Sequence, residues 1–218
     1  MAYMLQNEVD ALEKQLLTLA AIVEENVQHA VRSLLEQDAE LAQKVIKCDE
    51  QVNRMEVDLE EECLKVLALH QPVANDLRTI IGIIKINNDL ERIADQAVNI
   101  SERALAVIDA PTIRSPLQLE PMSAKAIDML EKSLDALVNA NLKLARTVLK
   151  LDEEVDRLHA ENYRLFKEQV RTNPQSVDAA LSYLTASRHL ERIADLATNI
   201  AEDVIYLNEG LIVRHTQA

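Results

Sequence analysis

One stretch occurs twice in this chain: LERIADQAVNISE at residues 90–102 and LERIADLATNIAE at residues 190–202. The two copies are identical at ten of their thirteen positions. An α-helix turns by about 100° per residue, so each copy divides into an apolar arc and an adjoining polar arc. The apolar arc of the first copy consists of Leu90, Ile93, Ala94, Ala97 and Ile100. The sequence therefore predicts two equivalent helices that each pack along one face.

The polar arc of each copy carries oxygen-bearing side chains about one turn apart. These are Glu91, Asp95, Asn99 and Glu102 in the first copy, and Glu191, Asp195, Asn199 and Glu202 in the second. Two carboxylates four residues apart on a helix repel each other by roughly 0.2–0.5 kcal/mol when no cation lies between them. Because this arrangement occurs twice, it favours metal binding, although local ion pairs with Arg92 and Arg192 could account for part of the pattern.

The composition bounds the class of protein. The 218 residues are 48% apolar but include only two Gly and five Pro, which indicates long helices with an aliphatic core. A net charge of −14 argues against binding to nucleic acid or to an anionic membrane, because both require basic surfaces. The N-terminus has charges where a secretion signal needs an apolar core, and no apolar run could span a bilayer. Cys48 and Cys63 lack metal-site spacing, so we expect core thiols in a reducing cytoplasm.

The sequence of the first half of the chain predicts three helices. Apolar residues at alternating steps of three and four predict a helix over about 3–36. Asp38 is suited to cap a second helix that runs to about His70. Pro72 interrupts that helix and is suited to be the first residue of a third, which ends near Ala110.

The second half repeats the first. Residues 111–121, PTIRSPLQLEP, contain three of the five prolines and are the expected linker. A helix is expected over about 122–139, and Asn141 then takes the capping place of Asp38. Asn173-Pro174 corresponds to Gln71-Pro72 of the first half. Gly210 is expected to end the last helix as a C-cap glycine.

These patterns predict an all-α fold built as a tandem pair of three-helix bundles. The six long helices, ~30 residues each, would be related by an internal pseudo-two-fold. The expected division is a first repeat at 1–110, a linker at 111–121, a second repeat at 122–210 and a C-terminal tail at 211–218.

The second helix of each half carries an acidic column of its own, and this completes the candidate metal sites. If the second and third helices of each half pack antiparallel, four oxygen ligands face one another and could hold divalent or trivalent ions such as Fe, Mn, Mg or Zn. The candidate ligands are Asp49, Asn53, Glu91, Asp95, Asp152, Asp156, Glu191 and Asp195. Possible auxiliary ligands are Glu56, Asn99, His159 and Asn199, where His159 occupies the place of Glu56 in the second half.

Other chemistry is missing from the sequence, which contains no Gly-rich phosphate loop and no cluster of Cys or His. Helical carboxylate bundles include di-iron oxidases, which typically use a Glu-x-x-His pair on each of two helices. This chain has no such pair. Two alternatives to a metal-binding regulator stay open: a di-metal carboxylate enzyme and a metal-free helical adaptor.

Three motifs together resemble the PhoU phosphate-uptake regulators. They are QPVANDLR at 71–78, D-x-x-V-N at 49–53, and the doubled L-E-R-I-A-D-x-A-x-N-I. The resemblance covers nearly the whole chain and implies a cytoplasmic, all-helical, often dimeric protein whose E(D)-x-x-x-D motifs bind metal. It implies a non-enzymatic negative regulator of the phosphate-starvation response, with the phosphate ABC transporter ATPase and a sensor histidine kinase as partners.

The chain departs from the family pattern at one position of each copy. The family commonly has Gly before the motif Asp, whereas this sequence has Ala94 and Ala194. Ala is the better helix former, so the helices should be kept. The added methyl is expected to narrow the approach of a partner or ligand.

Overall fold

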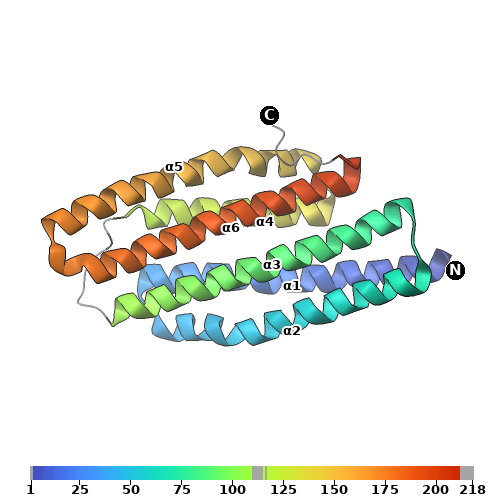
Figure 1. Cartoon of the computed structure of the whole chain (residues 1–218), viewed down its shortest axis with the longest axis horizontal. Coiled ribbons are helices and arrows are strands. Elements are labelled where there is room, and N and C mark those ends of the chain that lie inside the picture. Colours follow the sequence, from blue (N-terminus) through green and yellow to red (C-terminus); the bar gives the residue numbers. More distant parts are fainter. Residues whose placement is uncertain (1, 110–114, 116, 212–218) are drawn as a thin grey trace.

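Six long helices run lengthwise along the molecule (Figure 1). We describe a computed structural model of the chain, which covers residues 2–109, 115 and 117–211. The elements are α1 (Ala2–Glu36), α2 (Ala39–His70), α3 (Ala74–Ile108), α4 (Leu119–Asn139), α5 (Leu142–Thr172), the short 3₁₀ helix η1 (Pro174–Ser176) and α6 (Val177–Glu209). Over these residues there is no β-strand, so the expected all-α fold is confirmed.

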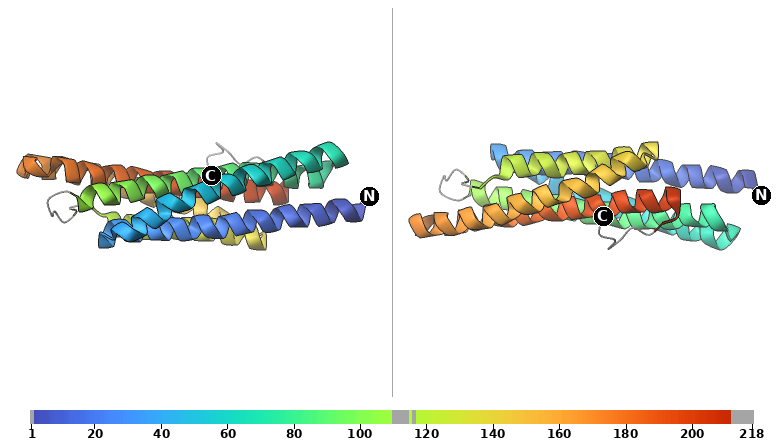
Figure 2. Two further views of the ribbon diagram at one scale, coloured as in Figure 1. Left: turned by 90° about the horizontal axis from the view of Figure 1, so that it is seen from below. Right: turned by 90° about the horizontal axis from the view of Figure 1, so that it is seen from above.

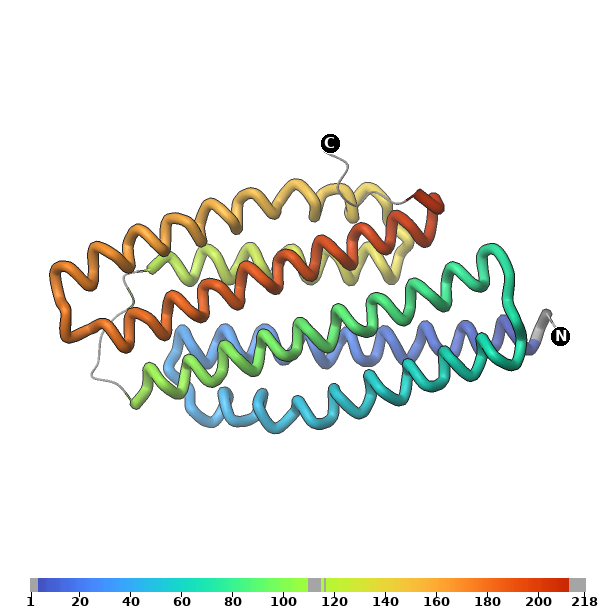
Figure 3. The backbone as a smooth tube through the Cα atoms, viewed as in Figure 1, coloured from blue at the N-terminus to red at the C-terminus, as the bar shows by residue number. Residues whose placement is uncertain are grey.

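The helices form two bundles, α1–α3 and α4–α6, that lie side by side. Figure 3 shows α3 and α6 next to each other along the middle of the molecule, and these two helices make the main contact between the bundles. The shorter α4 packs against α1 behind them (Figure 2). The predicted tandem pair of three-helix bundles is therefore confirmed.

The repeated stretch forms the centre of both bundles. All ten residues of the two apolar arcs are buried: Leu90, Ile93, Ala94, Ala97, Ile100, Leu190, Ile193, Ala194, Ala197 and Ile200. Each of the two helices must pack against both other helices of its own bundle and against the partner bundle. This demand explains why the apolar arc is wide and continuous in both copies.

Side chains predicted as caps begin and end the helices as expected. The Asp38 carboxylate accepts the backbone N–H of Leu41 at 3.0 Å, and Asn141 accepts that of Leu144 at 3.1 Å. These bonds satisfy N–H groups that a helix start leaves free. Gly210 ends α6 with φ +69°, a left-handed conformation that favours glycine.

Three sequence-based expectations about element boundaries need correction. Pro72 does not begin α3; it is buried in the connection, where Gln71 and Ala74 on either side have φ of 46° and 50° and Val73 is extended. The fourth helix begins at Leu119 rather than near 122, since a proline is tolerated in a first helical turn. It also has 21 residues instead of about 30. Residues 111–114 and 116 of the expected linker and 212–218 of the tail lie outside the described residues, as does residue 110 at the end of the first repeat.

The cysteines occupy the predicted core and near-core positions. Cys63 is fully buried, and burial, followed by the charges of Glu60 and Glu62, raises the pKa of its thiol to about 12. Cys48 is half-buried. Among the helices that the structure describes, none combines the length and the apolar character needed to cross a membrane.

Polar contacts and a close approach between Gly82 and Leu207 join the two bundles. Lys85 on α3 pairs with the buried Asp203 on α6 at 3.3 Å, and His189 Nδ1 lies 2.9 Å from Gln96 Oε1. The bundles also approach closely at Gly82, where an added Cβ would lie 2.4 Å from Cδ2 and 2.9 Å from Cγ of Leu207. Any larger residue at this position would overlap with the Leu207 side chain unless that side chain moved.

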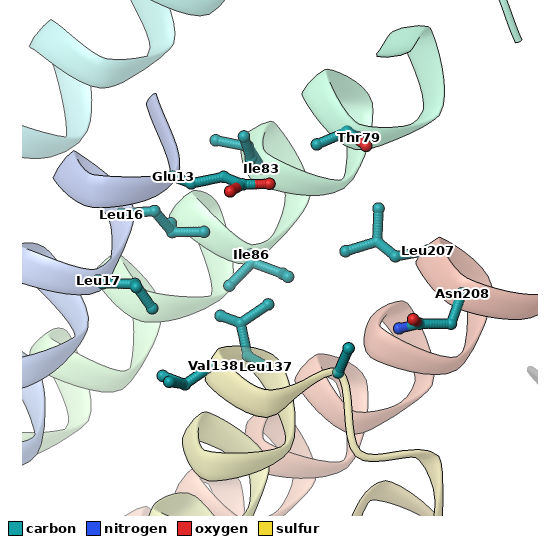
Figure 4. Close-up of a pocket in the computed structure, with 11 residues that line it drawn as sticks. Glu13, Leu16, Leu17, Thr79, Ile83, Ile86, Leu137, Val138, Leu207 and Asn208 are labelled. Carbon is teal, nitrogen blue, oxygen red and sulfur yellow. The ribbon is translucent and has the colours of Figure 1, made fainter. Parts of the chain in front are cut away.

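A cavity of about 320 Å³ lies beside this close approach (Figure 4). It opens where the short α4 ends against the longer α1 and α3, and Leu207 is one of its walls. The other lining side chains are Glu13, Leu16, Leu17, Thr79, Ile83, Ile86, Leu137, Val138, Ala140 and Asn208. Leu207 therefore has free volume next to it, into which it can move when crowded.

We expect Gly82→Ala to lower the free energy of unfolding by about 1–2 kcal/mol. Overpacking costs about 1–3 kcal/mol, the higher helix propensity of Ala offsets up to about 1 kcal/mol, and the cavity keeps the overlap at the mild end. In a Leu207→Ala background the sign should reverse, so that Gly82→Ala becomes neutral or stabilising. Urea unfolding of the four proteins of this double-mutant cycle measures the effect. Equal destabilisation in both backgrounds would contradict the close contact.

Candidate metal sites

The structure brings the eight predicted ligands together as two clusters, one in each bundle. The first cluster joins Asp49 and Asn53 of α2 to Glu91 and Asp95 of α3. Its members are close enough that the charge of Asp49 raises the pKa of both Glu91 and Asp95. The second cluster joins Asp152 and Asp156 of α5 to Glu191 and Asp195 of α6, and all of the last three raise the pKa of Asp152.

Within every pair, one side chain lies at the edge of the core and the next lies outside it. The half-buried members are Asp49, Glu91, Asp152 and Glu191, and the exposed members are Asn53, Asp95, Asp156 and Asp195. This follows from the helical repeat: one residue of each pair borders the apolar seam and the other lies one turn further along the helix.

The carboxylates of the first cluster are destabilised in their charged form. Burial is the main cause that raises the pKa of Glu91, followed by the charges of Asp95, Glu56 and Asp49, while Arg92 acts in the opposite direction. Burial also raises the pKa of Asp95. Arg92 pairs with Asp89 at 3.4 Å, so part of its charge is directed away from the cluster.

The second cluster shows the same effect more strongly. Burial, followed by the charges of Asp156, Asp195 and Glu191, raises the pKa of Asp152 from 3.8 to about 6. Burial and Glu191 also raise the pKa of Asp195. A bound cation or a proton would stabilise either cluster.

One carboxylate oxygen in each cluster is buried without a hydrogen-bond partner. These orphaned atoms are Oδ1 of Asp49 and Oδ1 of Asp152, which occupy equivalent positions in the two halves. The other oxygen of Asp49 accepts a hydrogen bond from Asn53 Nδ2 at 3.0 Å. A buried polar atom without a partner costs about 1–3 kcal/mol, more when it is charged, so each orphaned oxygen is suited to a metal ion.

The clusters fit a cation by their chemistry rather than by a preformed cage. Among residues 2–109, 115 and 117–211, no three His, Cys, Asp or Glu side chains are arranged closely enough to hold an ion as they stand. The half-buried and exposed carboxylates would have to turn toward the ion when it binds. Oxygen donors of this kind suit hard cations.

The auxiliary residues differ in how well they could contribute. Glu56 is half-buried beside the first cluster, and burial and Glu60 raise the pKa of its carboxyl. The Asn99 amide folds back and donates to the Asp95 carbonyl at 2.7 Å, and Asn199 is half-buried. His159 is oriented by Ser187, since its Nδ1 lies 3.0 Å from the serine Oγ.

Two features of the sites were not foreseen correctly from the sequence. Ala94 and Ala194 were expected to narrow the approach of a ligand, but both are buried in the core. Asn87 and Ser187, which contact the auxiliary positions of α2 and α5, were missed. The available signal was their position four residues before Glu91 and Glu191, on the same helix face.

Both bundles match one protein family. The PhoU domain matches residues 16–104 and again residues 119–204, which together make up most of the chain. The chain belongs to the PhoU family. Each match contains one copy of the repeated stretch and ends two residues after it, so each match falls within one of the two bundles.

Named relatives and solved structures agree with this assignment. A phosphate-specific transport system accessory protein PhoU homolog of Pseudomonas putida is 39% identical over 95% of this chain and 82% of its own length. A homolog from Aquifex aeolicus is 38% identical over 95% of this chain and 94% of its own. The crystal structure of PhoU from Pseudomonas aeruginosa is 36% identical, with a TM-score of 0.91 over 94% of this chain and 99% of that one.

Replacement of Asp152 tests the electrostatics of the metal-free second cluster. Its raised pKa means that the folded state holds the proton more tightly than the unfolded state. The resulting stability is fully present below about pH 3.8 and is lost as the pH rises through about 6. With a chelator present, we expect Asp152→Asn to be more stable than wild type by roughly 1 kcal/mol at pH 7.5, a value reduced for solvent screening.

Denaturant unfolding of both proteins between pH 4 and pH 7.5 measures this difference, which should shrink toward zero at the acidic end. The matched control is Glu168→Gln, because Glu168 is an exposed carboxylate of the same helix that lies outside the cluster. An Asp152→Asn protein less stable than wild type at pH 7.5 would mean that the carboxylate has a partner that stabilises it.

Proposed function

We propose that this protein is a non-enzymatic accessory regulator of phosphate-specific transport and a negative regulator of the phosphate-starvation response. The observation that carries the proposal is the match of both repeats, over 95% of the chain, to proteins named as phosphate-specific transport system accessory proteins. A solved relative from Streptococcus pneumoniae is likewise titled a phosphate transport system regulatory protein, with a TM-score of 0.84 at 29% identity.

We infer that the protein acts by binding, in the cytoplasm and as a homodimer. Its partners would be the ATPase of the phosphate ABC transporter and a sensor histidine kinase. The fold supports a binding function because its long helices offer extended surfaces to a partner.

The metal would be part of this function. Asp49, Asn53, Glu91 and Asp95 would hold ions in the first bundle, and Asp152, Asp156, Glu191 and Asp195 in the second. A bound Fe, Mn, Mg or Zn ion supplies positive charge between two helices of one bundle. The residues themselves orient oxygen ligands at the edge of the core, where burial already destabilises their charged forms.

Deletion of the gene tests the regulatory proposal. In phosphate-replete medium the deletion strain should express its phosphate-starvation genes at starvation levels, because the signal that represses them is lost. Transcript levels measured in the deletion strain and in a strain complemented with the wild-type gene give the answer. Normal repression without the protein would reject the negative-regulator function.

Metal titration tests the cofactor proposal. A cation that binds only the folded state adds about 2.7 kcal/mol of stability at 100 times its dissociation constant. For a chain of this size that corresponds to a rise of roughly 5–10 °C in melting temperature. Mn²⁺, Mg²⁺, Fe²⁺ or Zn²⁺ should therefore raise the melting temperature of the chelator-treated protein.

Paired variants show where the ions bind. Glu91→Ala with Asp95→Ala should abolish the response of the first bundle and leave that of the second. The control, Glu40→Ala with Glu61→Ala, removes two exposed carboxylates of α2 outside the cluster and should respond like wild type. A melting temperature that no metal changes would leave the metal-free adaptor as the better description, and turnover in a metal-dependent oxidase assay would favour the enzyme alternative.

A further inference from the structure

Besides Asn53, which corresponds to Asp156, the two clusters differ in a pair of neighbouring residues that changes the kind of donor atom available. Glu56 of α2 corresponds to His159 of α5, and Asn87 of α3 corresponds to Ser187 of α6. In both bundles these two residues contact each other between the second and third helices, one helical turn before Glu91 in α3 and Glu191 in α6.

In the first bundle, the contact between Glu56 and Asn87 offers only oxygen ligands. Asn87 is buried and donates its Nδ2 to the backbone carbonyl of Glu56 at 2.8 Å, which fixes the orientation of the amide. Asn87 Oδ1 is left buried without a hydrogen-bond partner. The Glu56 carboxylate lies near Glu91, whose pKa its charge raises.

In the second bundle, the equivalent contact between His159 and Ser187 includes an imidazole. His159 Nδ1 lies 3.0 Å from Ser187 Oγ, and Asn162 Nδ2 donates to the same Oγ at 3.0 Å. The Ser187 hydroxyl donates its single proton to Met122 Sδ at 3.2 Å. In the tautomer in which the serine oxygen accepts from the ring, Nδ1 carries the imidazole proton and Nε2 has the lone pair.

This arrangement is the one that metal-binding histidines use. A ligating imidazole usually donates its other N–H to a fixed acceptor, which sets the tautomer and holds the ring. His159 follows Asp156 by three residues on the same helix face, and Ser187 precedes Glu191 by four. In the same cluster Asp152 Oδ1 is buried and without a partner.

We propose that His159 binds metal through Nε2 and makes the second bundle selective for borderline transition metals such as Zn²⁺, Co²⁺ or Ni²⁺. The first bundle, whose ligands are all oxygens, keeps a preference for harder cations such as Mg²⁺ and Mn²⁺. This inference rests on the proposed binding of metal by the acidic clusters, and it assigns the two sites different ions. Ser187 is a positioning residue in this proposal.

The experiment uses full-length protein in which one site is removed at a time. Glu91→Ala with Asp95→Ala leaves the second site, and Glu191→Ala with Asp195→Ala leaves the first. Cu²⁺ is the spectroscopic probe, because coupling to imidazole nitrogen in electron paramagnetic resonance separates a nitrogen ligand from an all-oxygen site. Competition titrations then compare the affinities for Zn²⁺ and Mn²⁺.

We expect nitrogen coupling only when the second site is intact, and its loss in His159→Gln. That variant should bind Zn²⁺ at least about tenfold more weakly, with Mn²⁺ affinity changed less than about twofold. Ser187→Ala should weaken Zn²⁺ binding by roughly 10- to 100-fold, the usual effect of removing the group that orients a ligand. The reciprocal change Glu56→His should introduce nitrogen coupling at the first site.

Other outcomes would overturn the proposal, and they fall into two kinds. If the coupling of Cu²⁺ to nitrogen persists in His159→Gln and disappears in the control His29→Gln, the role of His159 is rejected while metal binding is left intact. Equal metal preferences at both sites would have the same meaning. Protein that binds no metal at either site would reject the metal part of the proposed function as well. Circular dichroism of each variant establishes that it is folded.

Discussion

The position of α3 and α6 constrains the rest of the structure. Each of these helices packs against both other helices of its own bundle, and the two also pack against each other. Most of their circumference must therefore be apolar, and only a narrow arc is left for polar side chains. The acidic residues occupy that arc, so the inner carboxylates of both clusters lie at the edge of the core rather than fully in water.

Partial burial of like charges has a physical consequence. The charged carboxylates lose solvation and repel one another, and both effects raise the pKa of Glu91, Asp95, Asp152 and Asp195. The outer residues of the clusters remain accessible and can turn toward an incoming ion. The fold thus places the inner carboxylates at the edge of the core and the outer ones one turn away, where their side chains can turn toward a cation.

The periodic features of this structure could be predicted from the sequence, but the features that depend on contacts between distant residues could not. The apolar seams and the acidic columns follow from helical spacing, and the caps at Asp38 and Asn141 follow from the residue types that favour a helix start. The burial of Pro72 and the short α4 depend on how the connections pack. The contact between Gly82 and Leu207, and the roles of Asn87 and Ser187, appear only when different helices are brought together.

The duplicated halves differ in their donors and yet carry the same number of carboxylates at the sites. The first bundle has Asp49, Glu56, Glu91 and Asp95, with Asn53 as the neutral member; the second has Asp152, Asp156, Glu191 and Asp195, with His159 as the nitrogen donor. The carboxylate that His159 replaces is recovered one turn earlier, at Asp156. Both sites therefore present four acidic groups to a cation, so a difference in metal preference between them would come from the imidazole rather than from a difference in charge.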